Sequence, residues 1–323
     1  MKNIKSLILI FAVICLFYNA QANSENPDGS IPIEMAVYNG ADSLYGTLLL
    51  PKDVESPPVV LIISGSGPTD RNGNQFGMVN NSLRFLAQDL ALKGIASVRY
   101  DKRGVGKSTC QQAEIELLFE HFIDDAACWL SELKHTNKFS NIFVAGHSEG
   151  SLIGMVAAKR GGANGFISIA GTGRRIDEVL LEQLSIYPEV MVNTSKVILD
   201  SLLMGEYVNN VSPLLYSLFR PSVQPYMISW LKYNPAEQLA LLTIPVLIIQ
   251  GTTDIQVQVK DAELLKEAKA NAELAIIEGM NHVLKYADAE RTKNLNTYSN
   301  SELPVVPEMI DVISEFILKY SEH

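Results

Sequence analysis

One serine of the chain stands in a pattern that is typical of a catalytic nucleophile. The pentapeptide at 146–150 reads Gly-His-Ser-Glu-Gly, so Ser148 has a glycine two positions away on either side. An apolar run at 141–145 directly precedes this pentapeptide, and a helical pattern directly follows it. Between a strand and a helix, G-x-S-x-G forms a sharp turn that exposes the serine hydroxyl. The N-terminus of the helix then offers free N–H groups and a positive dipole end to a developing oxyanion.

A serine nucleophile needs a general base, and the chain has five histidines among which to choose. We expect His282 to be the base, because it follows the last predicted core strand and precedes the closing helix. The other four lie within the pentapeptide, at the end of the chain, or on or beside an early helix: His147, His323, His121 and His135.

The third member of such a unit is an acid that orients the imidazole and stabilises its charged form. Asp254 stands at the carboxyl end of the predicted strand 245–249, and this gives the chain order Ser148, Asp254, His282. The order Ser…Asp…His is the one found with the G-x-S-x-G turn. Asp177, which follows the preceding strand, is the alternative acid.

These side chains must be positioned by a sheet of mostly parallel strands. Apolar runs typical of strands buried on both faces alternate with amphipathic helical patterns. The predicted strands cover 59–63, 95–100, 141–145, 165–170, 245–250 and 272–277, after an antiparallel hairpin at 31–38 and 44–50. Helical periodicity is found at 83–90, 115–133, 152–159, 260–269 and 306–320. This alternation predicts an α/β fold.

The alternation is interrupted between 171 and 242. That interval has no buried-strand run and is too long for a loop, so we expect a helical insert between two core strands. Four acidic residues occur there at helical spacings among polar neighbours, as on a solvated face: Glu182, Glu189, Asp200 and Glu206.

With these motifs the sequence resembles the α/β-hydrolase superfamily, and within it the secreted bacterial esterases and serine-aminopeptidase-like hydrolases. The similarity covers almost the whole chain after the first 22 residues. It rests on 64–68 (Ser-Gly-Ser-Gly-Pro), 99–108 (Arg-Tyr-Asp-Lys-Arg-Gly-Val-Gly-Lys-Ser), the pentapeptide, the segment 244–254 and the loop of His282. The family usually has His-Gly where this chain has Ser64-Gly65.

The resemblance implies an α/β-hydrolase fold, with a mostly parallel central sheet flanked by helices. The core would comprise 23–170 and 243–323, and 171–242 would form a helical cap. By the same match, the backbone N–H groups of Ser66 and Glu149 would form the oxyanion hole. No metal and no organic cofactor is implied.

Charge excludes some classes of partner. The 323 residues include 26 Lys and Arg against 36 Asp and Glu, a net charge of −10. Nucleic acids and anionic membranes require a basic face, so we expect neither as a partner. The expected partner is a small-molecule ester or a short peptide, and the oligomeric state stays open.

The N-terminus predicts export. Lys2 and Lys5 precede an apolar run at 7–17, and Ala20 and Ala22 supply small residues for signal peptidase. We therefore expect a signal peptide at 1–22, cleavage after Ala22, a secreted or periplasmic protein, and no stable membrane insertion afterwards. In such a compartment the remaining cysteines, Cys110 and Cys128, form either a disulfide or two buried thiols.

Together these features predict a secreted serine hydrolase that cleaves carboxylic esters through an acyl-enzyme. The alternative is an aminopeptidase-like serine peptidase, which would need carboxylates to meet the α-ammonium of its substrate. A hydrolase fold kept only for ligand binding would be expected to lack a member of the triad, and none is missing.

Overall fold

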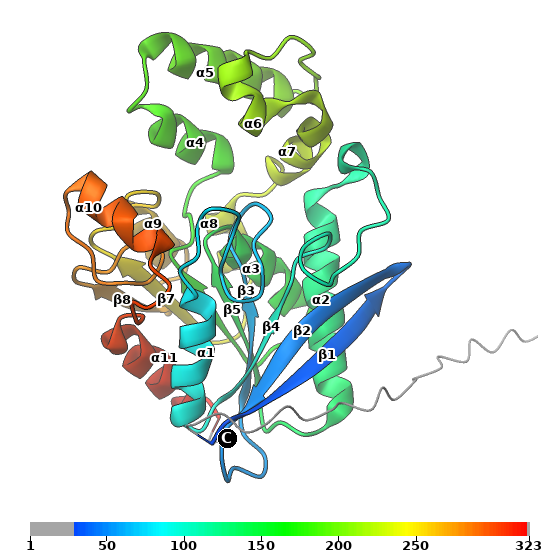
Figure 1. Cartoon of the computed structure of the whole chain (residues 1–323), viewed down its shortest axis with the longest axis vertical. Coiled ribbons are helices and arrows are strands. Elements are labelled where there is room, and N and C mark those ends of the chain that lie inside the picture. Colours follow the sequence, from blue (N-terminus) through cyan, green and yellow to red (C-terminus); the bar gives the residue numbers. More distant parts are fainter. Residues whose placement is uncertain (1–28, 322–323) are drawn as a thin grey trace, which may run out of the picture.

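The computed structural model describes residues 29–321, so the expected signal peptide at 1–22 and His323 lie outside the described residues. The chain folds around one sheet of eight strands, whose order is β1-β2-β4-β3-β5-β6-β7-β8 (Figure 1). The strands are β1 Ile31–Asn39, β2 Asp42–Leu50, β3 Val59–Ile63, β4 Ala96–Tyr100, β5 Ile142–His147, β6 Gly165–Ile169, β7 Val246–Gly251 and β8 Glu273–Ile277.

The sheet is parallel except at the β1–β2 edge. β2 pairs antiparallel with both β1 and β4, and every other pairing is parallel. The predicted hairpin is confirmed: Asn39 faces Asp42 across a tight turn in which Gly40 has a φ of 63°. In β3, β4, β6 and β7 every residue is buried, as expected of strands covered on both faces.

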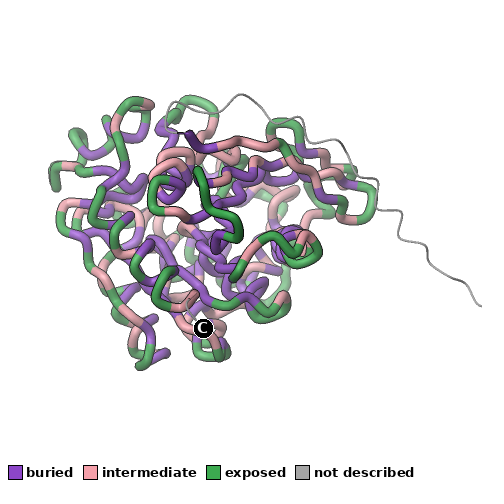
Figure 2. The backbone as a smooth tube through the Cα atoms, turned by 90° about the horizontal axis from the view of Figure 1, so that it is seen from below, coloured by how far each residue is buried: buried purple, intermediate pink, exposed green. Residues whose placement is uncertain are grey.

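Helices cover the two faces of the sheet, and successive residues of β3 point to opposite layers. Leu61 belongs to a core shared with α2 (Phe119–Thr136) and α3 (Glu149–Gly161). Its neighbour Ile62 belongs to a core shared with α1 (Ser82–Leu92) and α11 (Pro307–Lys319). Figure 2 shows buried stretches running through the middle of the molecule, with exposed segments along its outline and across the face that is viewed.

One predicted boundary is wrong. The helical period was expected to begin at Ile115, whereas α2 begins at Phe119. Ile115 lies in a short 3₁₀ turn (Glu114–Glu116) and is 55% exposed, and Leu118 is extended. The preceding residue Glu114 forms an ion pair with Arg220, which comes from the segment between β6 and β7.

Between β6 and β7 the chain forms helices. They are α4 Ile176–Leu184, α5 Glu189–Leu203, α6 Tyr216–Phe219, α7 Gln224–Trp230 and α8 Pro235–Ala240, with two 3₁₀ turns, Pro213–Leu215 and Pro221–Val223. Residues from α4, α5, α6 and α7 share a small apolar core of their own, which includes Val179, Leu199, Phe219 and Met227. Figure 1 shows α4 to α7 gathered at one end of the molecule, beyond the sheet. The remaining helices are α9 Val259–Ala268 and α10 Arg291–Asn296, with 3₁₀ turn Thr297–Ser299.

Two further features bear on the sequence expectations. Within residues 29–321, none of the helices combines the length and the apolar character needed to cross a bilayer. Cys110 and Cys128 are free and partly buried, so this structure contains the two-thiol alternative rather than the disulfide.

Candidate active site

The turn between β5 and α3 holds Ser148 in a strained backbone conformation. Its φ of 55° and ψ of −122° lie outside the regions that residues with a Cβ prefer. The strand and helix on either side fix this geometry, because Ser148 N donates to Ile169 O at 2.9 Å and Ser151 N donates to Ser148 O at 2.9 Å. The turn thus places the serine after the last residue of β5 and immediately before α3.

Close backbone contacts explain the two glycines of the pentapeptide. A Cβ at Gly146 would lie 2.1 Å from the carbonyl oxygen of Gly150. A Cβ at Gly150 would lie 2.4 Å from the carbonyl oxygen of Ile63. Backbone atoms cannot move aside as side chains do, so both positions require glycine.

His282 and Asp254 form a buried hydrogen bond. His282 Nδ1 lies 2.8 Å from Asp254 Oδ2, and the two residues are only 5% and 9% exposed. A carboxylate can only accept, so the hydrogen resides on Nδ1 and leaves Nε2 as a free acceptor. This is the tautomer that a general base for serine requires.

Asp254 is itself held by three further donors. Gln250 Nε2 donates to Oδ2 at 3.0 Å, and the backbone N–H groups of Gln256 and Val257 donate to Oδ1 at 2.8 and 3.0 Å. Burial acts to raise the pKa of Asp254, but the charge and the hydrogen bond of His282, together with the backbone hydrogen bonds from Val257 and Gln256, outweigh it and lower that pKa. The carboxylate therefore stays ionised and fixed in direction.

His147 connects the loop of His282 to the serine turn. Its Nε2 donates to the backbone oxygen of His282 at 2.8 Å, and the two imidazole rings are 4.9 Å apart at their centroids. Burial, and then the charge of His282, lower the pKa of His147 to about 3, so this imidazole remains neutral at physiological pH. Since His147 immediately precedes Ser148, the contact brings His282 to the serine. No hydrogen bond joins Ser148 Oγ to His282 Nε2 among the described residues, and such bonds are often long without substrate.

The two expected oxyanion donors come from two segments next to Ser148. A Cβ at Gly65 would lie 3.2 Å from Ser148 Cβ, so the backbone that leads into Ser66 passes directly beside the serine. Thr69 Oγ1 and Gln75 Nε2 donate to Ser66 O at 2.9 and 2.7 Å, and they hold this loop in place. Glu149 is the first residue of α3, so its N–H has no acceptor within the helix.

Three supporting residues were not foreseen: His147 as a donor, Gln250, and Lys102, which forms a buried ion pair with Glu149. The sequence could have indicated a role for Gln250, because it is a polar residue near the end of an otherwise apolar strand. The side-chain roles of His147 and Lys102 depend on partners from distant segments, so local sequence could not indicate them.

The other acids singled out in the sequence have cationic partners or face solvent. Asp177 lies in α4 and pairs with Arg175 at 2.7 Å rather than with His282. Glu182 pairs with Arg174 and Lys260, and Asp200 pairs with Lys196. Glu189 and Glu206 are exposed.

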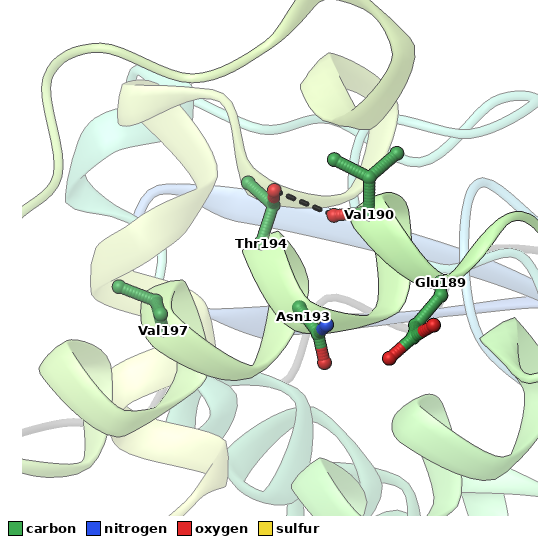
Figure 3. A pocket seen from close by; sticks show the side chains of 5 residues that line it. All are labelled: Glu189, Val190, Asn193, Thr194 and Val197. Atoms are coloured by element: carbon green, nitrogen blue, oxygen red, sulfur yellow. Dashed lines mark hydrogen bonds between the residues drawn. The ribbon is translucent and has the colours of Figure 1, made fainter.

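A separate depression of about 470 Å³ lies on α5, lined by Glu189, Val190, Asn193, Thr194 and Val197 (Figure 3). All five side chains come from one helix, and Thr194 Oγ1 donates to Val190 O at 2.7 Å within that helix. The depression therefore has no opposing wall and includes none of the residues around Ser148. Within 29–321, no group of three His, Cys, Asp or Glu side chains could hold a metal ion.

Comparisons with known proteins find hydrolases among the proteins to which this chain is similar. A family model described as serine aminopeptidase, S33, matches residues 77–209. The chain is 29% identical over 265 residues to the esterase EstD of Thermotoga maritima, a match that covers 78% of this chain. It spans 60% of the length of that curated relative.

Solved structures share the fold over most of their length. Est1E of Butyrivibrio proteoclasticus, determined with ferulic acid bound, superposes with a TM-score of 0.59 at 20% identity. The superposition covers 88% of this chain and 98% of that one. The esterase Pf2001 of Pyrococcus furiosus gives a TM-score of 0.57 at 16% identity, covering 90% and 91%.

Proposed function

We propose that this chain, which has the α/β-hydrolase fold predicted from its sequence, is a serine hydrolase that cleaves carboxylic esters. The observation that carries the proposal is the Asp254–His282 hydrogen bond, tied through His147 to the strained turn of Ser148. Together these contacts provide a nucleophile, a correctly protonated base and an orienting acid.

The proposed reaction proceeds through an acyl-enzyme. Ser148 Oγ attacks the ester carbonyl while His282 Nε2 takes the hydroxyl proton, and the carbonyl π electrons move onto oxygen. The N–H groups of Ser66 and Glu149 donate to that oxyanion. As the oxyanion collapses, the alkoxy group leaves with the proton from His282. Water then repeats the sequence on the acyl-enzyme, which releases the acid and regenerates Ser148.

Two observations favour esters over amides. The named relative EstD is an esterase. The acids expected of an aminopeptidase in 171–242 either pair with cations or face solvent. A carboxylate already paired with a cation is poorly suited to receive a substrate's α-ammonium. The second candidate remains an aminopeptidase-like serine peptidase, because the family model that matches residues 77–209 is described as one.

Two further proposals concern organisation. We propose that 171–242 acts as a cap that sets specificity, on a core formed by 23–170 and 243–323. We also propose export with cleavage after Ala22, and N-terminal sequencing of protein purified from the cell envelope or the medium should then begin at Asn23. A mature chain that retains Lys2 would contradict the export proposal.

The test of the function is active-site labelling followed by a substrate panel. A fluorophosphonate probe should label Ser148 in the wild type and leave Ser148→Ala unlabelled, with peptide mapping to identify the site. p-Nitrophenyl acetate, butyrate and octanoate should then turn over faster than aminoacyl p-nitroanilides. Labelling without turnover of any ester, or faster turnover of the anilides, would contradict the esterase proposal.

A further inference from the structure

A buried ion pair lies beside the proposed oxyanion hole. Lys102 Nζ is 2.9 Å from Glu149 Oε1, and their side chains are only 5% and 3% exposed. Lys102 comes from the loop after β4, whereas Glu149 directly follows Ser148 in the chain. The proposed triad chemistry uses neither side chain, yet burying two charges is costly unless they compensate each other.

The position of the carboxylate makes this pair relevant to the chemistry. Glu149 contributes its N–H to the proposed oxyanion hole, so its carboxylate belongs to the same residue whose N–H would donate to the oxyanion of the substrate. A second negative charge nearby, in a site largely shielded from water, opposes oxyanion formation. A carboxylate in the first turn also offsets part of the positive end of the α3 dipole.

Among residues 29–321, the other groups recorded around Glu149 do not supply a compensating positive charge. Tyr226, from α7, faces it: burial, and then the Glu149 charge, raise the pKa of this phenol well above its ordinary value, so Tyr226 is neutral. Phe122 lies against the ammonium, with Lys102 Nζ 5.4 Å from the centre of its ring. His147, which the charge of Lys102 also reaches, is held neutral.

We propose that Lys102 is a positioning residue for the reaction, whose ammonium neutralises the Glu149 carboxylate so that an oxyanion can form at the adjacent N–H. The inference rests on the proposed esterase function. According to this proposal, the activity requires the Lys102 ammonium only because the side chain of Glu149 is charged. Removing both charges should therefore cost much less than removing the ammonium alone.

The experiment is a double-mutant cycle on the full chain, in which kcat and KM are measured with a p-nitrophenyl ester. We expect Lys102→Met to lower kcat by about ten- to a hundredfold while KM changes less than about threefold, since the loss is confined to the transition state. The double variant Lys102→Met/Glu149→Gln should recover kcat to within about fivefold of the wild type. Lys102→Arg keeps the charge and should retain most of the activity.

The matched control is Lys107→Met. Lys107 lies in the same loop and also pairs with a glutamate, Glu34, but both side chains are exposed, at 62% and 42%. This variant should have wild-type kcat and KM. Circular dichroism and thermal melting measure the folded fraction of every variant, and rates are corrected for it.

A trifluoromethyl ketone separates electrostatic positioning from a merely structural role. It adds to the serine as a tetrahedral oxyanion, so its Ki should rise across the variants in proportion to the loss of kcat/KM. Wild-type kcat and Ki in Lys102→Met, or a double variant more than about fivefold below the wild type, would overturn the inference. If Lys102→Met does not fold, the kcat of the double variant becomes the deciding measurement, and a value more than about fivefold below the wild type overturns the inference. Failure of the wild type to hydrolyse any ester would overturn the proposed function, and this inference with it.

Discussion

At the scale of single residues, the candidate site combines a serine with a strained backbone, Ser148, and an acid held by several hydrogen bonds, Asp254. Ser148 adopts its unusual φ of 55° because strand, turn and helix all constrain it. Asp254 accepts four hydrogen bonds, one of them from His282. A strained backbone at a serine and a buried acid with a shifted pKa are both typical of residues placed for chemistry.

The nucleophile gives the first prediction. Ser148→Ala should lower kcat by about 10⁴–10⁶, because the hydroxyl forms the covalent bond and no other group replaces it. The double variant Ser148→Ala/His282→Ala should be little worse than either single variant, because the two residues act as a unit. Steady-state kinetics with near-UV circular dichroism would measure this, and losses that multiply would contradict a shared role.

The acid gives the second prediction. Asp254→Asn should lower kcat by about 10⁴, because an amide favours the wrong imidazole tautomer. Asp177→Asn is its control and should have wild-type kcat, since Asp177 contacts Arg175 instead. If Asp177→Asn lost its activity while Asp254→Asn stayed active, the acid that orients His282 would be Asp177 in α4.

The same carboxyl group makes stability depend on pH. The pKa of Asp254 in the folded protein lies below its ordinary value of 3.8. Above that ordinary value its contribution to stability is fully present, and it is lost as the pH falls through the lower folded value. The difference in free energy of unfolding between the wild type and Asp254→Asn should therefore stay constant above about pH 5 and shrink as the pH falls from about 4 towards about 2 in urea titrations. A constant difference over that range would contradict the lowered pKa.

At the scale of elements, the β5–α3 turn is constrained by its contact with the end of β3. A Cβ at Gly150 would meet backbone oxygens of both Ile63 and Ser64, at 2.4 and 2.6 Å. The helix α3 therefore approaches the strand more closely than any other residue type would allow. This close approach also carries the Ser64–Ser66 segment to the serine, where Gly65 contacts Ser148.

A further prediction tests this approach. Gly150→Ala should reduce the free energy of unfolding by about 3 kcal/mol or more, because backbone atoms cannot yield to the new methyl group. Gly205→Ala is the control: Gly205 has a φ of 78° but open space around it, so its cost should be only the backbone strain of roughly 1–2 kcal/mol. Urea denaturation would compare them, and an equal or smaller loss for Gly150→Ala would refute the steric argument.

At the scale of the whole molecule, the parallel order of β3, β5, β6 and β7 brings four strand ends to one edge of the sheet. Ser148 follows β5, and Asp254 lies after β7, so strands far apart in sequence supply one site. The segment between β6 and β7 is anchored at its entry, where Arg174 donates to Asp261 Oδ1 and Oδ2 at 3.0 and 2.7 Å. Phe119 N in α2 donates to Ser229 Oγ at 2.8 Å and fixes α7 at the other side.

The last prediction concerns specificity at this scale. Replacing the four acids Glu182, Glu189, Asp200 and Glu206 singly with Gln should change ester kcat/KM by less than about threefold, because paired or solvated surface carboxylates contribute little. Short and medium acyl esters should remain the better substrates in every variant. A preference for aminoacyl amides that disappears in one variant would favour the peptidase alternative.

The sequence alone determined those features that depend on neighbouring residues. The strand–turn–helix around Ser148, the hairpin at Gly40 and the buried strands follow from local backbone sterics and hydrophobic periodicity. The alternation of strands and helices then restricts the topology to a parallel sheet, and this orders Ser148, Asp254 and His282 along one edge.

Only the tertiary structure decided which supporting side chains meet. Lys102 and Glu149 are 47 residues apart, and His147 reaches across 135 residues to the backbone of His282. Such pairs form because packing excludes water and obliges each buried polar group to find a partner, and local sequence patterns do not encode that partner.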